Sequence, residues 1–459
     1  MDNRTQQQQD KLLKTILEQR FFNPWRGLTK FKDERSLVND ANLELYITST
    51  CNQKCEYCYL QKYPKLYPAK YNKPELILHN LELMCRYIMI NNYQIPLLDL
   101  YSGEIWHNKF GWDVLDIIYK YLEQGMQIGY ILITSNCSFV SNPEALQRIQ
   151  TYINKFREIQ CPIVFSASVD GKIVDDISRP RNNKEEKYDD DFYELLGSFA
   201  QVNNFLFHPM VSSHNVKYWI ENYKWWKEYL SQYGFDKTAI MMLEVRNDGW
   251  TDENIEDYCK FLDVLMDEFL YDDCKGDSEL FAKMVADMRT PNNIVKLSGY
   301  VPWVLGKADS FPGCTVANSL TVRLGDLAIC PCHRQAYAEY LYGNFVVEND
   351  EIVDIKAINT AMAIKILMTN VATTSPVCSK CIFNYCCLHG CLGSQLETGK
   401  DPFFPLENIC KFFKAKYTHL FNYYREHGIL DHWKSWSPNE PNGQMIATLL
   451  RINDKLESE

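Results

Sequence analysis

The chain lacks any apolar run that approaches the roughly 18–20 residues needed to cross a bilayer. Its first residues, Met1 to Lys11, are polar and rich in glutamine, unlike the apolar stretch of a secretory signal peptide. Positive charge is also in deficit, with 48 Lys and Arg against 59 Asp and Glu, and nucleic-acid affinity depends largely on clustered positive charge. We therefore expect a cytoplasmic protein with no membrane span and no nucleic-acid partner.

Internal repeats are absent too, and low complexity is confined to Gln6–Gln9. At 459 residues the chain is long enough for two or three domains, and 46% hydrophobic residues can bury a sizeable core. Against this ordinary background stand 17 cysteines. In a chain that shows no sign of export, cysteines at short spacings indicate metal ligands rather than a disulfide framework.

Changes in pattern along the chain predict five segments. These are a polar leader or cap at 1–40, alternating strand and helix patterns at 41–250, a helical connector at 251–305, a cysteine-rich region with short strands at 306–420, and a helical tail at 421–459. The acidic residues of the connector are typical of a solvated outer face.

Six short apolar runs within 41–250 are predicted as strands. They are Leu43–Thr48, Leu97–Tyr101, Ile128–Thr134, Ile163–Ser168, Phe205–Val211 and Ala239–Val245. Helical patterns such as Pro74–Tyr93 and Trp112–Glu123 separate them, and parallel strands need crossovers of about a dozen residues or more. The expected fold is therefore α/β, a partial (β/α)6 TIM-like barrel, with an open doubly wound sheet as the alternative that the pattern leaves open.

The first of these strands is followed directly by a CxxxCxxC run of Cys51, Cys55 and Cys58. Three thiolates in one loop can hold three irons of a [4Fe–4S] cube, which leaves the fourth iron open to a chelating ligand. The carboxyl ends of strands are where α/β sheets place their chemistry. With the aromatic Tyr57 before the last cysteine, the run resembles the CxxxCxΦC hallmark of the radical S-adenosylmethionine (SAM) superfamily.

This resemblance implies that SAM chelates the open iron, and that reduction of the cluster releases a 5′-deoxyadenosyl radical that abstracts a hydrogen atom. The second strand ends in Ser102-Gly103-Glu104, similar to the GGE motif of the family except that Ser102 replaces its first glycine. By that resemblance the Glu104 carboxylate binds the methionine ammonium.

Residues after the next strands match further cofactor contacts of the family. Asn136 follows the third strand, and Ser168 precedes Asp170-Gly171 at the end of the fourth. Arg179 is the expected partner of the cofactor carboxylate, with Arg181 as its substitute. The alternatives are that Asn136 and Asp170-Gly171 are only turn residues and that Arg179 is a surface charge.

A second group of cysteines is more specific. It has the spacing C-x2-C-x5-C-x3-C and comprises Cys378, Cys381, Cys387 and Cys391, for which the chance probability is about 0.001. Upstream, Cys314 precedes Gly325 and Cys330 in C-x10-G-x4-C, and Cys410 lies downstream. Together with the first motif, this pattern resembles the SPASM extension of radical SAM enzymes, expected here as a small α+β domain.

The SPASM resemblance implies two auxiliary [4Fe–4S] clusters, which makes three in all. One is held by Cys378, Cys381, Cys387 and Cys410. The other is held by Cys314, Cys330 and Cys391, and its fourth ligand is open: Cys332 is a candidate, with a bystander thiol or a substrate site as the alternatives. A tetrahedral zinc site with four cysteine ligands has similar spacings, but the first motif and the alternating strands disfavour it.

SPASM enzymes mostly modify peptides or proteins. The leading hypothesis is therefore a maturase that forms a thioether or carbon–carbon cross-link in a ribosomally synthesised precursor peptide, supplied with electrons by a partner such as flavodoxin or ferredoxin. Side-chain oxidation of the sulfatase-maturase or alcohol-dehydrogenase kind is the second hypothesis, and a non-enzymatic electron carrier the third. Glu244 and Arg246, at the end of the last strand, are candidate substrate acid–base residues, unless they form a strand-end salt bridge.

Overall fold

The protein is described by a computed structural model. The structure describes residues 5–19, 42–101, 103–183, 188–287, 319–368, 375–384, 387, 391–399, 401, 403–437, 439 and 443–458. They form a mixed α/β protein with two compact units. Unit 1 comprises Met1–Ser168, Pro180–Leu206 and Thr315–Thr369, and unit 2 comprises Val169–Arg179, Phe207–Cys314 and Asn370–Glu459.

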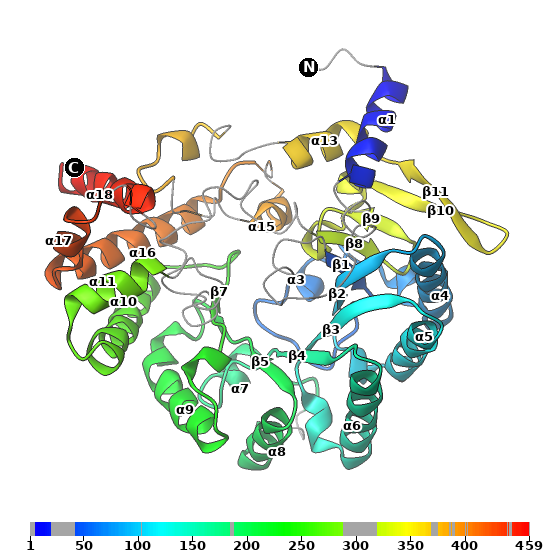
Figure 1. Ribbon diagram of the computed structural model, residues 1–459, viewed down its shortest axis with the longest axis horizontal. Helices are drawn as coiled ribbons and strands as arrows, with labels where there is room; N and C mark the ends of the chain where they lie inside the picture. The colour runs from blue at the N-terminus through cyan, green and yellow to red at the C-terminus, as the bar shows by residue number, and fades with distance from the viewer. Residues whose placement is uncertain are drawn as a thin grey trace. The chain divides into compact units, whose positions relative to one another are not determined.

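The centre of unit 1 is a sheet with the strand order β11-β10-β9-β8-β1-β2-β3-β4-β5 (Figure 1). Its strands are β1 Asn42–Tyr46, β2 Gln94–Tyr101, β3 Gln127–Ser135, β4 Ile163–Ala167, β5 Asn204–Phe207, β8 Ser319–Arg323, β9 Ala328–Cys330, β10 Gly343–Glu348 and β11 Glu351–Ala357. The run from β8 through β1, β2 and β3 to β4 is parallel, whereas β8, β9, β10 and β11 pair antiparallel.

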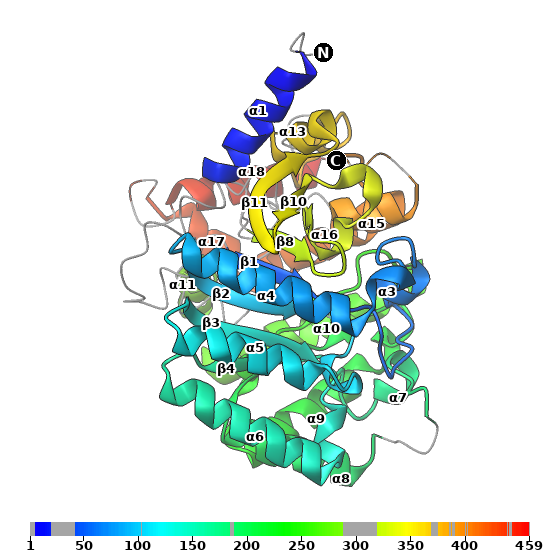
Figure 2. The same ribbon diagram turned by 90° about the vertical axis from the view of Figure 1, so that its right-hand side faces the viewer.

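Helices follow the parallel strands of unit 1, as crossover connections require. They are α4 Pro74–Ile90, α5 Gly111–Glu123, α6 Pro143–Glu158 and α8 Asp190–Gln201; α1 Gln6–Leu17, α3 Tyr59–Lys62 and α13 Thr360–Met368 complete the α-helices described in this unit. Figures 1 and 2 show α4, α5 and α6 side by side along one face of the sheet. The start of α6 is specified locally, because the Asn142 side chain caps it and Pro143 occupies its first turn.

The two faces of β1 and β2 differ in chemistry. Leu43 and Leu45 of β1 lie in register with Leu98 and Leu100 of β2, and all four are buried. Since side chains alternate along a strand, Glu44, Tyr46, Asp99 and Tyr101 lie on the opposite face, which we call the inner face. The core of unit 1 thus has an apolar layer on one side of these strands and a polar one on the other.

Unit 2 contains a small parallel pair, β6 Met210–Val211 and β7 Leu243–Glu244. Its helices are α7 Asp175–Ser178, α9 Trp219–Gln232, α10 Asp252–Asp267, α11 Ser278–Asp287, α15 Leu392–Glu397, α16 Glu407–Glu426, α17 Ile429–Lys434 and α18 Gly443–Ser458. No helix in the described part of the chain is long and apolar enough to span a membrane.

The predicted α/β class and mostly parallel sheet are confirmed, with local differences. The expected strand Phe205–Val211 is divided into β5 and β6, because Pro209 between them cannot donate to a strand ladder. The last expected strand is shortened to β7, and β8, from the predicted cysteine-rich region, pairs with β1. The partial barrel, the separate SPASM domain and the five-segment division stay predictions.

Candidate functional site

The first three cysteines lie in the loop that joins β1 to α3, and each is half-buried. The Cys58 amide donates to the Cys55 carbonyl at 3.0 Å, and Cys58 is the N-cap of α3. Cys51 receives the Gln53 amide on its sulfur at 3.4 Å, while the Asn136 side-chain amide lies 3.9 Å from that sulfur. Amide donors aimed at a sulfur favour its thiolate form, as a cluster ligand requires.

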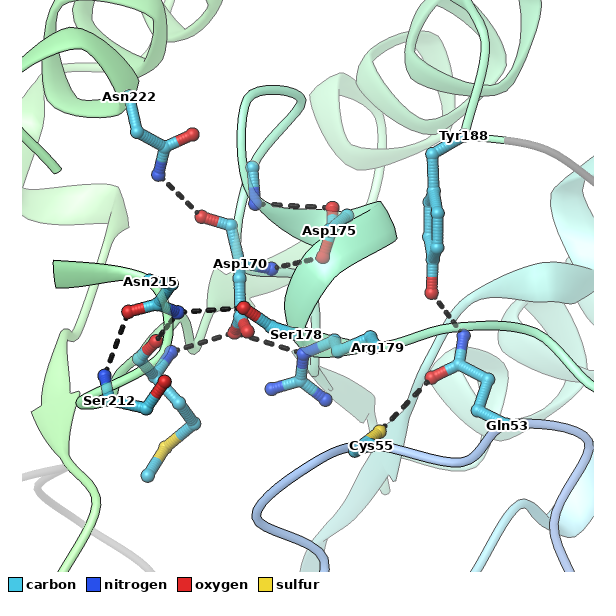
Figure 3. A network of polar contacts seen from close by, with 12 residues as sticks. Gln53, Cys55, Asp170, Asp175, Ser178, Arg179, Tyr188, Ser212, Asn215 and Asn222 are labelled. Atoms are coloured by element: carbon cyan, nitrogen blue, oxygen red, sulfur yellow. Dashed lines mark hydrogen bonds and ion pairs between the residues drawn. The ribbon is translucent and has the colours of Figure 1, made fainter. Parts of the chain in front are cut away.

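This loop is fastened by a short segment of unit 1 that follows Pro180. The Lys54 amide donates to the Pro180 carbonyl at 2.8 Å, and Gln53 and Arg181 form an isolated antiparallel bridge. The Gln53 side-chain amide also donates to the Tyr188 hydroxyl (Figure 3). The Tyr188 ring lies 4.3 Å from the Arg181 guanidinium. Arg181, the substitute considered for cofactor binding, therefore helps to shape the cysteine loop.

Gly103 is held against the residues that lead into Cys51. Its amide donates to the Thr48 carbonyl at 2.7 Å, and the Glu104 amide donates to the Thr50 carbonyl at 2.9 Å. A Cβ atom on Gly103 would lie 2.3 Å from the Thr50 oxygen, so only glycine fits at this position. The middle residue of the Ser-Gly-Glu segment is therefore a requirement of the loop's own packing, and Ser102 lies outside the described residues.

Glu104 is fully buried at the end of this segment. Its carboxylate accepts the Asn136 amide at 2.7 Å, the Ser135 hydroxyl at 3.0 Å and the Trp106 amide at 3.3 Å. Burial raises the pKa of Glu104 to about 7, and these three hydrogen bonds limit the rise. A cation that binds next to this carboxyl would lower its pKa and so stabilise the ionised form.

Asn136 connects Glu104 to the cysteine loop. Besides its amide contact with Glu104, its side chain donates to the Asn52 side chain at 2.7 Å. Its Oδ1 accepts the Ser138 amide at 3.0 Å. The structure thus brings together Cys51, Glu104 and Asn136, which the sequence had placed after three different strands.

The remaining predicted cofactor contacts of unit 1 are less defined. Tyr57 and Ser168 are half-buried, and the Ser168 amide donates to the Ser135 carbonyl at 2.7 Å. Their roles, like that of Ser102, stay predictions.

In unit 2 Arg179 forms a buried ion pair with Asp170, with its Nε 2.9 Å from the Asp170 Oδ1 (Figure 3). Asp170 also accepts the Met210 amide at 2.8 Å, and its own amide donates to Asp175. Gly171 adopts a φ of +116°, where a Cβ would meet Asn222. Gly171 thus begins the turn that leads into α7, and Arg179 is a buried rather than a surface charge.

Four of the cysteines predicted as auxiliary-cluster ligands line one cavity of unit 2. They are Cys378, Cys381, Cys387 and Cys410. Apolar side chains such as Phe383, Ile409 and Phe413 form much of the remaining wall, and burial raises the pKa of Cys410 to about 11. No three described His, Cys, Asp or Glu side chains close on a single metal ion. A four-thiol donor set in a largely apolar wall fits the [4Fe–4S] cluster that the SPASM resemblance implies.

The predicted ligands of the other auxiliary cluster are distributed over both units. In unit 1, Cys330 is fully buried at the end of β9, and Cys332, two residues further on, is almost fully buried. Cys391 belongs to unit 2, and Cys314 lies outside the described residues. A Cβ on Gly325 would lie 2.3 Å from the Tyr71 Cβ, which explains the glycine of that motif. This ligand set stays a prediction.

Glu244 lies in a buried ion pair with Lys416 of α16, and Tyr258 of α10 donates to the same carboxylate at 2.5 Å. Burial alone would raise the pKa of Glu244, but the charge and hydrogen bond of Lys416, together with the hydrogen bonds from Tyr258 and the backbone, lower it overall. This is the salt bridge considered as the alternative to an acid–base role, although Lys416 rather than Arg246 is the partner. Arg246 is half-buried next to β7.

No protein-family model matches the chain, and no curated protein matches it. Among solved structures it is similar to native anSMEcpe with bound AdoMet, with a TM-score of 0.51 and 16% identity over 84% of this chain and 98% of that one. The same values hold for native anSMEcpe with AdoMet and the Cp18Cys peptide, and a form with a hexahistidine tag gives 0.52 and 17%. The chain thus has the fold of anSMEcpe, an anaerobic sulfatase-maturating enzyme of the radical SAM/SPASM class.

Proposed function

We propose that this chain is a radical SAM enzyme with a SPASM extension that carries out an oxidative modification of a peptide substrate. The observation that carries the proposal is the joining of the CxxxCxxC loop to Glu104 through Asn136 and Gly103. A [4Fe–4S] cluster with SAM on its open iron supplies, when bound, a reducing electron and a 5′-deoxyadenosyl radical.

Residues of the chain have separate tasks in this proposal. Cys51, Cys55 and Cys58 hold the cluster, and the buried Glu104 carboxylate orients SAM by binding its ammonium group. Asn136 keeps the loop and Glu104 in register, so that the cofactor and the reducing centre share one rigid frame.

The other predicted contacts complete the cofactor site. Ser168 binds near the ribose, Arg179 binds the cofactor carboxylate, and Tyr57 and Ser102 line the cysteine loop and the Ser-Gly-Glu segment. The buried Asp170 fixes the Arg179 guanidinium in one orientation, which supports this role.

The SPASM cysteines add the auxiliary centres that make the reaction oxidative. Cys378, Cys381, Cys387 and Cys410 hold one auxiliary cluster, and their shared cavity supports this assignment. Cys314, Cys330 and Cys391 hold the other, for which Cys332 is the candidate fourth ligand. These centres would accept the electron that leaves the substrate after hydrogen abstraction.

The leading substrate is a ribosomally synthesised precursor peptide that acquires a thioether or carbon–carbon cross-link. A second candidate is oxidation of one side chain to a carbonyl, and it is favoured by the structural likeness to anSMEcpe, which was solved with the Cp18Cys peptide. In either case a small reducing protein such as flavodoxin or ferredoxin supplies the electron, in an anaerobic cytoplasm.

Anaerobic reconstitution followed by reduction with dithionite in the presence of SAM tests the proposal. The wild-type chain should release 5′-deoxyadenosine, and the triple variant Cys51→Ala/Cys55→Ala/Cys58→Ala should release none. Equal release from both would refute the cofactor site, and no release from either would favour a non-enzymatic electron carrier. Mass spectrometry of candidate peptides then separates loss of two hydrogens with a new linkage from a carbonyl product.

A further inference from the structure

The inner face of unit 1 carries a row of polar side chains on three adjacent parallel strands. Glu44 of β1 lies in register with Asp99 of β2 on one side and with Thr321 of β8 on the other. Neighbouring strands are about 4.8 Å apart, so these side chains form one continuous polar strip. Asn42 and Tyr46 extend the strip along β1, two residues to either side of Glu44.

Four residues of this strip each have a buried polar atom that makes no hydrogen bond in the described structure. Among the described residues, Asn42 Oδ1, Tyr46 OH, Asp99 Oδ1 and Thr321 Oγ1 are buried and have no hydrogen-bond partner. Each such atom costs about 1–3 kcal/mol, and native proteins hold few of them. Four on one strip therefore indicate a built site that no described part of the chain completes.

The chemistry of the strip selects the kind of ligand. Asn42 Oδ1 is only an acceptor, the carboxylates of Glu44 and Asp99 are acceptors whenever they are ionised, and the hydroxyls of Tyr46 and Thr321 accept readily. A ligand that satisfies this strip must donate several hydrogen bonds.

Two described basic side chains lie beside the strip, His333 next to Glu44 and Arg323 in register with Tyr46. His333 Nδ1 lies 2.8 Å from Glu44 Oε1, and its ring stacks on Tyr101 at 4.0 Å. The guanidinium of Arg323, on β8, is already paired with Asp326 and donates to the Ala336 carbonyl. No described basic side chain pairs with Asp99, and burial together with the charge of Glu44 raises its pKa to about 8, while His333 opposes the rise.

We propose that Asn42, Glu44, Asp99 and Thr321 form a subsite that binds a positively charged side chain of the substrate, a lysine ammonium or an arginine guanidinium. Such a group donates to the orphaned oxygens and supplies the charge that stabilises two neighbouring carboxylates. The inference deepens the proposed function, because it names the chemistry that the substrate must present to this chain.

Binding of small analogues tests the subsite with reconstituted enzyme and SAM. Nα-acetyl-lysine methylamide and Nα-acetyl-arginine methylamide are titrated by calorimetry beside Nα-acetyl-norleucine methylamide, a neutral analogue of lysine. We expect at least one cationic probe to bind at least tenfold more tightly than the neutral one. Equal affinity for all three, or no binding by any, would overturn the inference.

Variants separate recognition from folding. Asp99→Asn and Thr321→Val should each lower the affinity for the cationic probe at least tenfold. Thr321→Val should leave the melting temperature unchanged or raise it, because it removes a buried hydroxyl that has no described hydrogen-bond partner. The control Glu82→Gln removes an exposed carboxylate that pairs with Lys120 and should leave binding intact. Unchanged binding in both inner-face variants would refute the subsite.

The assay of SAM cleavage without substrate keeps the two proposals apart. If 5′-deoxyadenosine forms but the cationic probes show no preference, the subsite fails alone. If the probes bind selectively but no 5′-deoxyadenosine forms, the proposed function fails alone.

Discussion

Replacing Gly103 with alanine should damage the cofactor site more than the fold. The new Cβ would lie 2.3 Å from the Thr50 oxygen and 2.8 Å from the Ser49 oxygen. Both are backbone atoms, so no side-chain rotation relieves the contact. Because Thr50 directly precedes Cys51, the loop that carries the first cysteines must shift, and the hydrogen bond from Glu104 to Thr50 must lengthen.

The size of the effect follows from the cost of overpacking. Inserting one methyl group where nothing can yield costs about 1–3 kcal/mol. If displacement of the loop relieves the clash, the population with native cysteine placement falls by about 5-fold to 150-fold, since 1.36 kcal/mol corresponds to a factor of ten. The rate of 5′-deoxyadenosine release under saturating dithionite should fall by a similar factor, with a loss of bound iron.

Two glycines provide matched controls. A Cβ on Gly343, in the β10–β11 hairpin, would lie 2.6 Å from the Lys356 oxygen, so Gly343→Ala should lower the melting temperature with iron content and cofactor cleavage per folded chain unchanged. A Cβ on Gly249 would have no atom within 4 Å, so Gly249→Ala should leave the melting temperature, the iron content and the cofactor cleavage unchanged. Wild-type iron content and cleavage in Gly103→Ala would refute the reasoning.

Three further changes test other parts of the structure. Cys410→Ser should remove about four irons from the reconstituted protein, as counted by iron and sulfide analysis, whereas Cys161→Ser, at a buried thiol outside the motifs, should remove none. Burial raises the pKa of Glu104 to about 7, so the affinity for SAM measured by calorimetry should fall about tenfold from pH 8 to pH 6. The cause is that the carboxyl gains a proton over this range and no longer attracts the ammonium group. The Glu104→Gln variant should bind SAM weakly at both pH values. Lys416→Met should lower the free energy of unfolding in urea by about 3–5 kcal/mol, because Glu244 is then buried without its ion-pair partner. The double variant Glu244→Gln/Lys416→Met should recover most of the lost stability. No recovery would contradict the ion pair.

Local sequence signals predicted much of the fold. Apolar runs of strand length located β1 to β4, and the helical pattern Pro74–Tyr93 begins at the first residue of α4. Spacing grouped Cys378, Cys381 and Cys387, which are three of the four cysteines that line the cavity of unit 2. These features share one property, since each is specified by residues close together in the chain.

Long-range pairing was not predictable in the same way. β8 joins β1 although the two strands are separated by most of the chain, and parallel pairing leaves no turn signal between them. Lys416 meets Glu244 across 172 positions, so the sequence could suggest a salt bridge at this strand end but not its partner. Tertiary packing decides such contacts, because any apolar strand edge or buried acid has many candidate partners along the sequence.

The alternation in β1 was visible in the sequence, but its meaning required the sheet. Strands of a parallel sheet that is covered on both faces usually carry continuous apolar runs. In β1, by contrast, apolar and polar side chains alternate over Leu43, Glu44, Leu45 and Tyr46. Glu104 and Asp99 each have a buried carboxylate oxygen and a raised pKa, yet they differ in how the chain supports them. Glu104 has three donors, while Asp99 keeps an oxygen that no described residue satisfies.

That difference leads to different expectations for the two acids. The three donors keep Glu104 in place before any ligand binds, and a cation then adds to an existing frame. Asp99 has no donor on its buried oxygen in the described structure, so its ionised form depends on a positive group brought from outside. Titration of the two carboxyls, followed by infrared difference spectroscopy in the wild type and in Asp99→Asn, should therefore show that a bound cationic probe lowers the pKa of Asp99 and leaves that of Glu104 unchanged. A shift confined to Glu104 would place the cation at the cofactor site instead.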